Sequence, residues 1–221
     1  IVMHDATLDR TTGRTGRIDR THSSALARTD AGRWFARSFA GERVPTLASA
    51  LEALRSAMVV NLEIKQGGSS GDRGVERVIE LVRDRGPGAI LLSSFDERIV
   101  AQLARRAGPE RTGLLARRGL LRPVACARRL GAGTLVLSCR QLMTRRVERA
   151  NAAGLDVWIH TLRSPSEWTR AVQSGCECVI GDDPETLLMW RGREGRPGQE
   201  GPRDGGEVQA RGEADTPARG G

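Results

Sequence analysis

The residues best suited to chemistry in this sequence follow short apolar runs. In the stretch NLEIK, a carboxylate and an ammonium stand two positions apart, at Glu63 and Lys65. Side chains alternate along a strand, so Asn61, Glu63 and Lys65 share one face, opposite the two apolar residues between them. Charges on an inward face are costly unless they pair or bind an ion. The spacing therefore indicates either a structural ion pair or an ion-binding site, and both interpretations stay open.

A second polar group opens the chain. The apolar run Ile1–Met3 leads directly into His4 and Asp5, before a loop of Thr, Arg and Gly. If the run is a strand, the alternation of side chains places His4 inward. Imidazole titrates near neutral pH and can transfer protons there. A lone histidine is more often structural, so His4 becomes a catalytic candidate only in combination with the charged pair of NLEIK.

The elements that must position these groups are short apolar runs separated by helical patterns. Seven runs are typical of strands, and they are residues 1–3, 58–65, 89–95, 112–116, 133–138, 155–162 and 176–181. Most of them are followed by a segment with apolar residues at helical spacing, such as GVERVIELV, residues 74–82. Strands that alternate with helices predict a parallel sheet.

Polar residues follow nearly every run, and this distribution favours one parallel fold. They are His4-Asp5, Glu63 and Lys65, Ser93-Ser94, Ser138, His160-Thr161 and Asp182-Asp183. A (β/α)8 barrel gathers its chemistry from the carboxyl ends of many strands. A doubly wound sheet would concentrate it at one switch point. We therefore expect an α/β fold of the TIM-barrel type.

Composition bounds the possible partners. The net charge is +8, and the basic residues are 34 Arg and a single Lys, without any Tyr. The arginines are spread evenly along the sequence with no basic cluster, so solvated arginine faces are favoured over nucleic-acid binding. The only lysine, Lys65, indicates a position where a compact ammonium is preferred to a guanidinium.

Cysteine spacing and hydropathy exclude further classes. Cys126, Cys139, Cys176 and Cys178 contain no C-x-x-C pair, so buried reduced thiols are favoured over a zinc site. No run of about 18 apolar residues is present that could span a bilayer. The oligomeric state and the compartment stay open, with the cytoplasm favoured.

The end of the chain differs in composition from the rest. From about residue 191 onward, Gly, Pro, Arg and acidic residues dominate, and Val208 is the only large apolar side chain after Gly192. Such a segment cannot bury enough surface to offset the entropy lost on ordering. We expect one domain over residues 1–190 and a disordered tail over residues 191–221.

Five stretches together resemble the glycerophosphodiester phosphodiesterase family. They are HDATLDRTTGRTG, DAGRWFARSFAGERVPTLASALEAL, NLEIK, LLSSFD and GCECVIGDDPETL. They occur in the family's order from His4 to Leu187, and the first two are specific. The resemblance implies a (β/α)8 barrel that hydrolyses small-molecule glycerophosphodiesters to glycerol 3-phosphate and an alcohol, in glycerophospholipid metabolism.

The resemblance also implies roles for individual residues. Family members use a divalent metal, Mg²⁺ or Ca²⁺, and two histidines. His4 matches the second histidine, Glu63 the metal-binding glutamate of an E-x-K motif, and Lys65 the substrate-binding lysine of that motif. The stretch from Thr11 to Leu47 resembles an insertion beside the barrel mouth.

These roles suit the chemistry of phosphodiester cleavage. The phosphoryl oxygens gain negative charge during attack, and a hard cation held by carboxylates, with an ammonium beside it, stabilises that charge. The leaving alkoxide needs a proton, and an imidazole can supply one near neutral pH.

The sequence departs from the family pattern in its first part. An H-R-G motif does not occur, and no E-x-D triplet ends any of the seven apolar runs. We therefore expect His4 to end the third strand of a barrel whose first two strands are missing from this chain. The alternative is a degenerate, catalytically inactive barrel that serves as a binding or regulatory module. The seven runs and the two missing strands together make nine, whereas a (β/α)8 barrel has eight strands. One of the runs is therefore not a barrel strand.

Two departures lie near the other end of the barrel. Relatives commonly have W-T-V-N where this chain has His160 to Arg163, and I-T-D where it has Ile180 to Asp182. The aromatic wall expected at the first of these is replaced by an imidazole. His160 is either a substrate contact or a neutral packing residue, and the alcohol that is accepted stays open.

Overall fold

The computed structural model describes residues 1–54, 59–65, 71–85 and 89–194. The chain divides into two compact units, residues 1–182 and residues 183–221. Within the described residues, the first unit is organised by a six-stranded parallel sheet whose strands neighbour one another in chain order. The strands are β1 (Val60–Glu63), β2 (Ile90–Ser94), β3 (Thr112–Leu115), β4 (Thr134–Ser138), β5 (Asp156–Leu162) and β6 (Cys178–Gly181).

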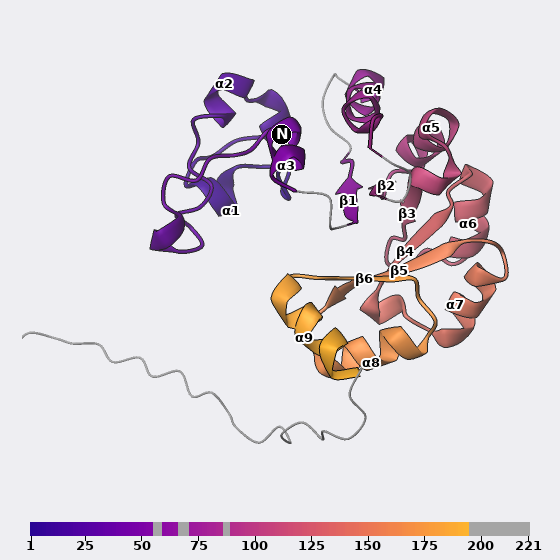
Figure 1. The fold of residues 1–221 in the computed structure, drawn as a ribbon. Helices are drawn as coiled ribbons and strands as arrows, with labels where there is room; N and C mark the ends of the chain where they lie inside the picture. The colour runs from indigo at the N-terminus through magenta and orange to yellow at the C-terminus, as the bar shows by residue number, and fades with distance from the viewer. Residues whose placement is uncertain (55–58, 66–70, 86–88, 195–221) are drawn as a thin grey trace, which may run out of the picture. The chain divides into compact units, whose positions relative to one another are not determined.

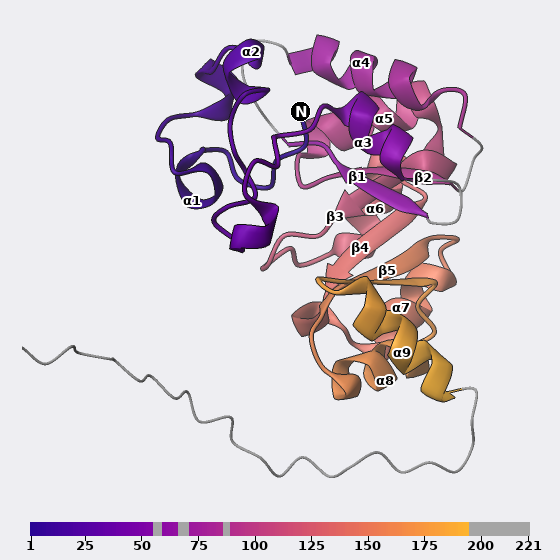
Figure 2. The ribbon, with the colours of Figure 1, turned by 60° about the vertical axis from the view of Figure 1, so that its left-hand side comes forward.

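A helix follows each of the first five strands. These helices are α4 (Gly71–Val82), α5 (Glu97–Ala107), α6 (Pro123–Leu130), α7 (Thr144–Asn151) and α8 (Pro165–Gln173). Figures 1 and 2 show the sheet curving, with these helices along its outer side. The predicted parallel α/β pattern is therefore confirmed as a curved, partial barrel of six strands.

The outer face of the sheet is held by apolar packing against the helices. Ile90 and Leu92 of β2 form one buried cluster with Val75 and Val82 of α4 and Leu103 of α5, and each is at most 3% exposed. The predicted apolar face of α4 is thus confirmed. Burying a side chain of this size stabilises the fold by about 1.5–3 kcal/mol.

The inner face carries a second apolar layer. Leu91, Leu115, Val136 and Trp158 come from four successive strands and form a buried cluster. Leu91 and its neighbour Leu92 belong to different clusters, on opposite faces, because side chains alternate along a strand. Residues two positions further along these strands then lie on the inner face at its carboxyl end.

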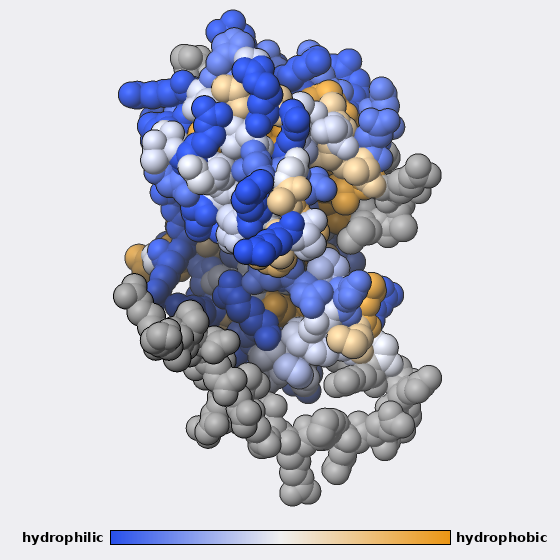
Figure 3. Space-filling view, turned by 90° about the vertical axis from the view of Figure 1, so that its left-hand side faces the viewer, coloured by the Kyte–Doolittle hydropathy of each residue, from blue (hydrophilic) through white to orange (hydrophobic). Residues whose placement is uncertain are grey.

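Residues 1–54, called the N-terminal segment below, are built differently. The elements there are α1 (Asp9–Thr12), α2 (Ser23–Leu26), α3 (Leu47–Ala53) and 3-10 turns at Ile18–Arg20 and Arg37–Phe39. Leu8, Leu26 and Val44 are its buried apolar residues before α3. Figure 3 shows the side of the molecule with this segment, where the surface is mostly hydrophilic with scattered hydrophobic spots.

The predicted strand at Ile1–Met3 is wrong, and so is its assignment as the third barrel strand. Val2 donates its backbone N–H to the Pro45 carbonyl at 3.0 Å, but no described strand forms a ladder with this run. Three residues without a neighbouring strand offer too few hydrogen bonds to define one. Ile1–Met3 is therefore the run, among the seven, that does not join the sheet.

The four cysteines are free thiols. Cys126 and Cys139 are buried, and Cys176 and Cys178 are half-buried. Burial raises the pKa of all four thiols, which keeps them protonated and weakly reactive near neutral pH.

Of the second unit, the structure describes helix α9 (Pro184–Glu194). Asp183 caps it, since its Oδ1 accepts from the backbone N–H of Glu185 at 3.0 Å. The helix passes the expected boundary at residue 190, and residues 195–221 of the predicted tail lie outside the described residues. No described helix is long and apolar enough to cross a bilayer.

Candidate active site

The charged pair of NLEIK lies at the carboxyl end of β1. Lys65 Nζ donates to Glu63 Oε1 at 2.7 Å, and the two side chains are 38% and 29% exposed. Leu62 and Ile64 pack against the outer cluster, so the predicted alternation of faces is confirmed. The pair places a carboxylate and an ammonium side by side, where solvent and a ligand can reach them.

A hydrogen bond between strands supports this edge of the site. Ser93 of β2 is fully buried, and its hydroxyl donates to Asn61 Oδ1 at 2.7 Å. Glu63 is the register partner of Ser93 in the β1–β2 ladder. Asn61 and Ser93 therefore fix the inner face immediately below the Glu63 carboxylate.

His160 belongs to the same region of the inner face. It stands opposite Ser138 in the β4–β5 ladder, next to a register irregularity between Ile159 and Leu162. Its buried Nε2 has no hydrogen-bond partner among the described residues. Burial lowers the pKa of the imidazole, while the negative charge of Glu63 opposes that shift. The structure thus places a neutral imidazole within electrostatic reach of Glu63.

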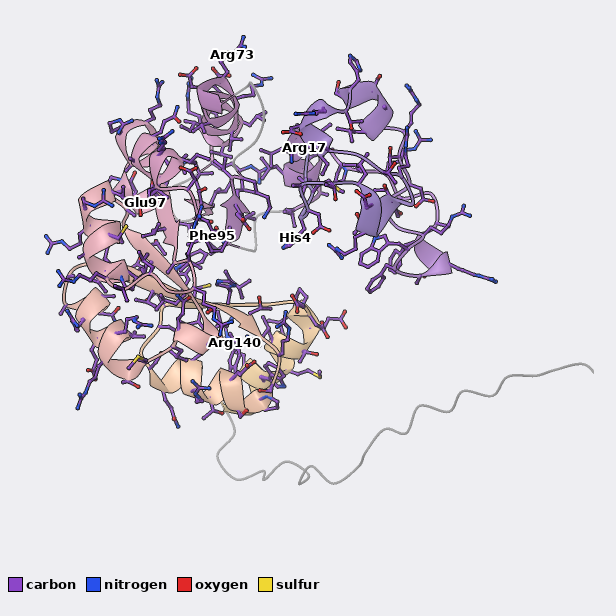
Figure 4. The ribbon with its side chains drawn as sticks, turned by 180° about the vertical axis from the view of Figure 1, so that it is seen from behind. His4, Arg17, Arg73, Phe95, Glu97 and Arg140 are labelled. Carbon is purple, nitrogen blue, oxygen red and sulfur yellow. The ribbon has the colours of Figure 1, made fainter. Side chains whose placement is uncertain are left out.

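His4 is held by an acidic neighbour. Its Nδ1 lies 2.7 Å from Asp5 Oδ1, and Arg10 donates to the other oxygen of that carboxylate at 2.6 Å. The Arg10 guanidinium, and then His4, hold the pKa of Asp5 well below its usual range. A carboxylate at Nδ1 orients the ring and leaves Nε2 as the nitrogen for other contacts. Figure 4 shows His4 at the edge of the N-terminal segment.

The predicted site residues are brought together only in part. Glu63 and Lys65 are in direct contact. His4 makes no hydrogen bond or ion pair with either of them in the part of the chain that the structure describes, and its side chain is 80% exposed. The expectation that His4 points inward from a strand is therefore wrong, since the run before it forms no strand.

The loops after β2, β3 and β4 are tied together at this end of the sheet. Arg117 Nε donates to the Phe95 carbonyl at 3.1 Å, and the Gln141 amide donates to the Arg117 carbonyl at 3.0 Å. Figure 4 shows Phe95 among these strands. These bonds hold the three loops together around the polar carboxyl ends of the strands, and no local sequence pattern indicates them.

An ion pair between Arg163 and Asp182 joins the ends of β5 and β6. Arg163 Nε lies 3.2 Å from Asp182 Oδ2, and both side chains are about 70% exposed. The two positions belong to the stretches where the sequence departs from the family pattern.

The suitability of the site for a divalent metal rests on its oxygen ligands. No group of three or more His, Cys, Asp and Glu side chains comes together among the described residues. Glu63 supplies one carboxylate, which suits Mg²⁺, because this ion often takes one or two carboxylates and completes its shell with water and phosphate oxygens. One carboxylate does not make a Ca²⁺ cage of protein oxygens.

Comparisons with known proteins agree with this geometry. Residues 1–186 match the model of the glycerophosphoryl diester phosphodiesterase family. A glycerophosphodiester phosphodiesterase from Caldanaerobacter subterraneus is 30% identical over 190 residues, which cover 85% of this chain and 78% of the relative.

Solved structures show the same likeness. A phosphodiesterase from Oleispira antarctica, in complex with the product sn-glycerol-3-phosphate, aligns with a TM-score of 0.75 at 24% identity, covering 86% of this chain and 78% of that one. A glycerophosphodiester phosphodiesterase from Agrobacterium tumefaciens aligns with a TM-score of 0.64 at 25% identity, covering 85% and 79%. With its charged pair at a strand end and a family match over most of its length, this chain belongs to the glycerophosphoryl diester phosphodiesterases, a family of phosphoric diester hydrolases.

Proposed function

We propose that this protein hydrolyses glycerophosphodiesters to glycerol 3-phosphate and an alcohol, with a divalent metal, as a step of glycerophospholipid metabolism. The observation that carries the proposal is the solvent-accessible Glu63–Lys65 pair at the carboxyl end of β1. The Oleispira antarctica neighbour, which holds sn-glycerol-3-phosphate, supports the same product class. The proposal includes a (β/α)8 barrel, in which two strands beyond the six described close the sheet.

Glu63 and Lys65 have complementary roles in this proposal. Of the two candidate metals, Mg²⁺ and Ca²⁺, the single Glu63 carboxylate favours Mg²⁺, and Glu63 would hold this ion, which supplies charge stabilisation at the phosphoryl oxygens when bound. Lys65 contributes a fixed ammonium that contacts the same oxygens. Because the two side chains already pair at 2.7 Å, the ammonium is in place before the substrate arrives. The pair also keeps the Glu63 carboxylate oriented toward the carboxyl end of the strand.

His4 is proposed as the general acid. Asp5 holds the ring at Nδ1, and Nε2 is then the nitrogen that donates a proton to the departing alkoxide. The Arg10–Asp5 bonds hold that carboxylate ionised and fixed. The role requires the full-length enzyme to bring His4 to the substrate.

The first test is Glu63→Gln in the full-length protein. A neutral amide is a weaker ligand for a hard cation, so the metal concentration for half-maximal hydrolysis of glycerophosphocholine should rise at least about tenfold. Calorimetric titration with Mg²⁺ and Ca²⁺ should show the same loss of affinity. Glu52→Gln on α3, an exposed position, is the matched control. Unchanged metal affinity in Glu63→Gln would remove Glu63 from the metal site.

The second test separates proton donation from other roles of His4. His4→Ala should slow hydrolysis of glycerophosphocholine by about 10²- to 10⁴-fold, the usual range for general acid–base catalysis. It should slow a p-nitrophenyl ester of glycerol 3-phosphate far less, because p-nitrophenolate leaves without a proton. Equal losses on both substrates would rule out the general acid. No metal-dependent hydrolysis by the full-length protein would favour the inactive barrel instead.

A further inference from the structure

A groove of about 900 Å³ lies over α6 and α7, away from the Glu63–Lys65 pair. It is called the α6–α7 groove below, and the residues that line it are Leu121, Arg122, Pro123, Val124, Ala125, Arg128, Met143, Arg145, Arg146, Arg149, Ala152 and Ala153. It is formed by the two helices and by the residues that lead into them from β3 and β4. Nothing in the proposed hydrolysis uses it.

Positive charge gathers along this groove. Five of the lining residues are arginines and none of the lining residues is acidic. Within the described part of the chain, none of the five makes an ion pair, and Arg146 only donates to the Gln141 carbonyl. Arg129 of the same helix α6, by contrast, is paired with Glu97 at 2.6 Å. The groove therefore offers an uncompensated positive field to an anionic partner.

The even spread of arginine along the sequence did not indicate this cluster. Arg122 and Arg128 belong to the start and end of α6, and Arg145 and Arg149 lie one turn apart on α7. Only the packing of the two helices brings residues so far apart in the chain to one groove.

Two large apolar side chains stand exposed beside these charges. Leu121 is 92% exposed and Met143 is 56% exposed, and each lies just before one of the two helices. Leu121 follows Arg117, Arg118 and Leu120 in a short basic loop after β3. Apolar side chains surrounded by arginines are typical of segments that enter the boundary between lipid headgroups and acyl chains.

We propose that the α6–α7 groove docks the protein on a membrane surface that contains anionic phospholipid. The arginines bind the headgroup phosphates, and Leu121 and Met143 enter the layer beneath them. A small soluble anion would bind the arginines but would make no apolar contact with the exposed Leu121 side chain. Single-stranded nucleic acid is held through aromatic stacking, and no aromatic residue lines this groove.

The proposal is tested by sedimentation with vesicles. The full-length protein should bind vesicles of phosphatidylcholine mixed with phosphatidylglycerol, and bind vesicles of phosphatidylcholine alone much more weakly. Arg145→Gln/Arg149→Gln should lower partitioning onto the anionic vesicles by about 25-fold, at about fivefold for each arginine near an anionic surface. Arg145→Lys/Arg149→Lys should restore binding.

A matched control removes the same charge elsewhere. Arg73 of α4 and Arg105 of α5 are exposed and make no ion pair among the described residues, and Figure 4 shows Arg73 on α4. Arg73→Gln/Arg105→Gln should therefore retain most of the binding. Leu121→Ser should lower binding several-fold at unchanged charge, and Val172→Ser on α8 is its control. Melting temperatures should match the parent protein, which shows that each variant is folded.

Three results would overturn the proposal. The first is equal binding to both kinds of vesicle. The second is an equal loss of binding in the groove variant and in the Arg73/Arg105 control, because general charge would then account for it. The third is unchanged vesicle binding in Leu121→Ser together with tight binding of inorganic phosphate by the parent, which would assign the groove to a soluble anion.

Discussion

The N-terminal segment and the curved sheet are stabilised in different ways. In the sheet, Leu92, Leu135, Leu137 and Ile159 are completely buried. In the N-terminal segment, the aromatic residues are largely exposed, and Phe35 reaches 70% exposure. The Phe35 ring contacts those of Trp34 and Phe39 at the surface rather than in a core.

In the N-terminal segment, the loop that contains the exposed aromatic residues is stabilised by hydrogen bonds rather than by apolar burial. The Asp30 carboxylate accepts from the backbone N–H groups of Gly32 and Arg33 at 3.0 Å and of Gly41 at 2.9 Å. Such bonds define a loop without a core beneath it. The proposed site draws on both regions, since Glu63 and Lys65 lie on the sheet and His4 on the segment. Changes to one region should therefore affect one part of the site and leave the other in place.

The largest expected effect comes from the sheet. Leu135→Ala removes a fully buried side chain of β4 and should lower the free energy of unfolding by about 2–5 kcal/mol. Phe35→Ala, at a mostly exposed ring, should change it by less than about 0.5 kcal/mol. Urea denaturation of both variants measures the contrast. Similar losses would show that the N-terminal aromatic residues are packed as tightly as the sheet.

An intermediate effect is expected from the polar frame of the segment. Asp30→Asn weakens three charge-assisted bonds, so limited proteolysis within residues 31–41 should speed up several-fold while the melting temperature of the sheet stays the same. The Asp30 pKa lies well below its usual range because backbone donors stabilise the carboxylate. This stabilisation is present above about pH 4 and is lost as the pH falls through the lowered pKa. Cleavage of the parent should therefore also speed up in strong acid, and a cleavage rate in Asp30→Asn equal to that of the parent would contradict the role of Asp30.

The smallest effect concerns His160 in the sheet. Burial lowers the pKa of His160 in the folded chain. Below about pH 6.5 the unfolded chain therefore binds more protons than the folded chain, and the free energy of unfolding decreases as the pH decreases. His160→Gln should flatten the unfolding free energy between about pH 6.5 and pH 5. Denaturation curves at several pH values measure this slope. An identical slope in the variant would mean that the imidazole is equally easy to protonate in both states.

Local patterns in the sequence predicted most of the sheet. Each of the first five strands combines an apolar run with a following helix of the same unit. Ile1–Met3 has the same local composition, but it pairs with no described strand. A short apolar run cannot reveal by itself whether a partner strand exists.

The candidate site could be predicted only for residues that are close together in the sequence. Glu63 and Lys65 are two positions apart, so alternation along one strand was enough to place them together. The proximity of His160 to Glu63 depends on the curvature of the sheet across five strands, which no local pattern encodes. The Arg163–Asp182 pair joins two strand ends and was missed for the same reason. Whether His4, Glu63 and Lys65 act as the resemblance implies stays a prediction.

The chain-order arrangement of the sheet has a consequence for how the protein is made. Val60 pairs with Ile90 and Trp158 with Cys178, which are separations of 30 and 20 positions. Among the six described strands, each one pairs with the strand that precedes or follows it in the chain. At translation rates of about 5–20 residues per second, a further strand partner leaves the ribosome roughly every one to six seconds. Helices and strand pairs form within microseconds. The sheet can therefore assemble in the order of its synthesis, with each strand docking on one that is already folded.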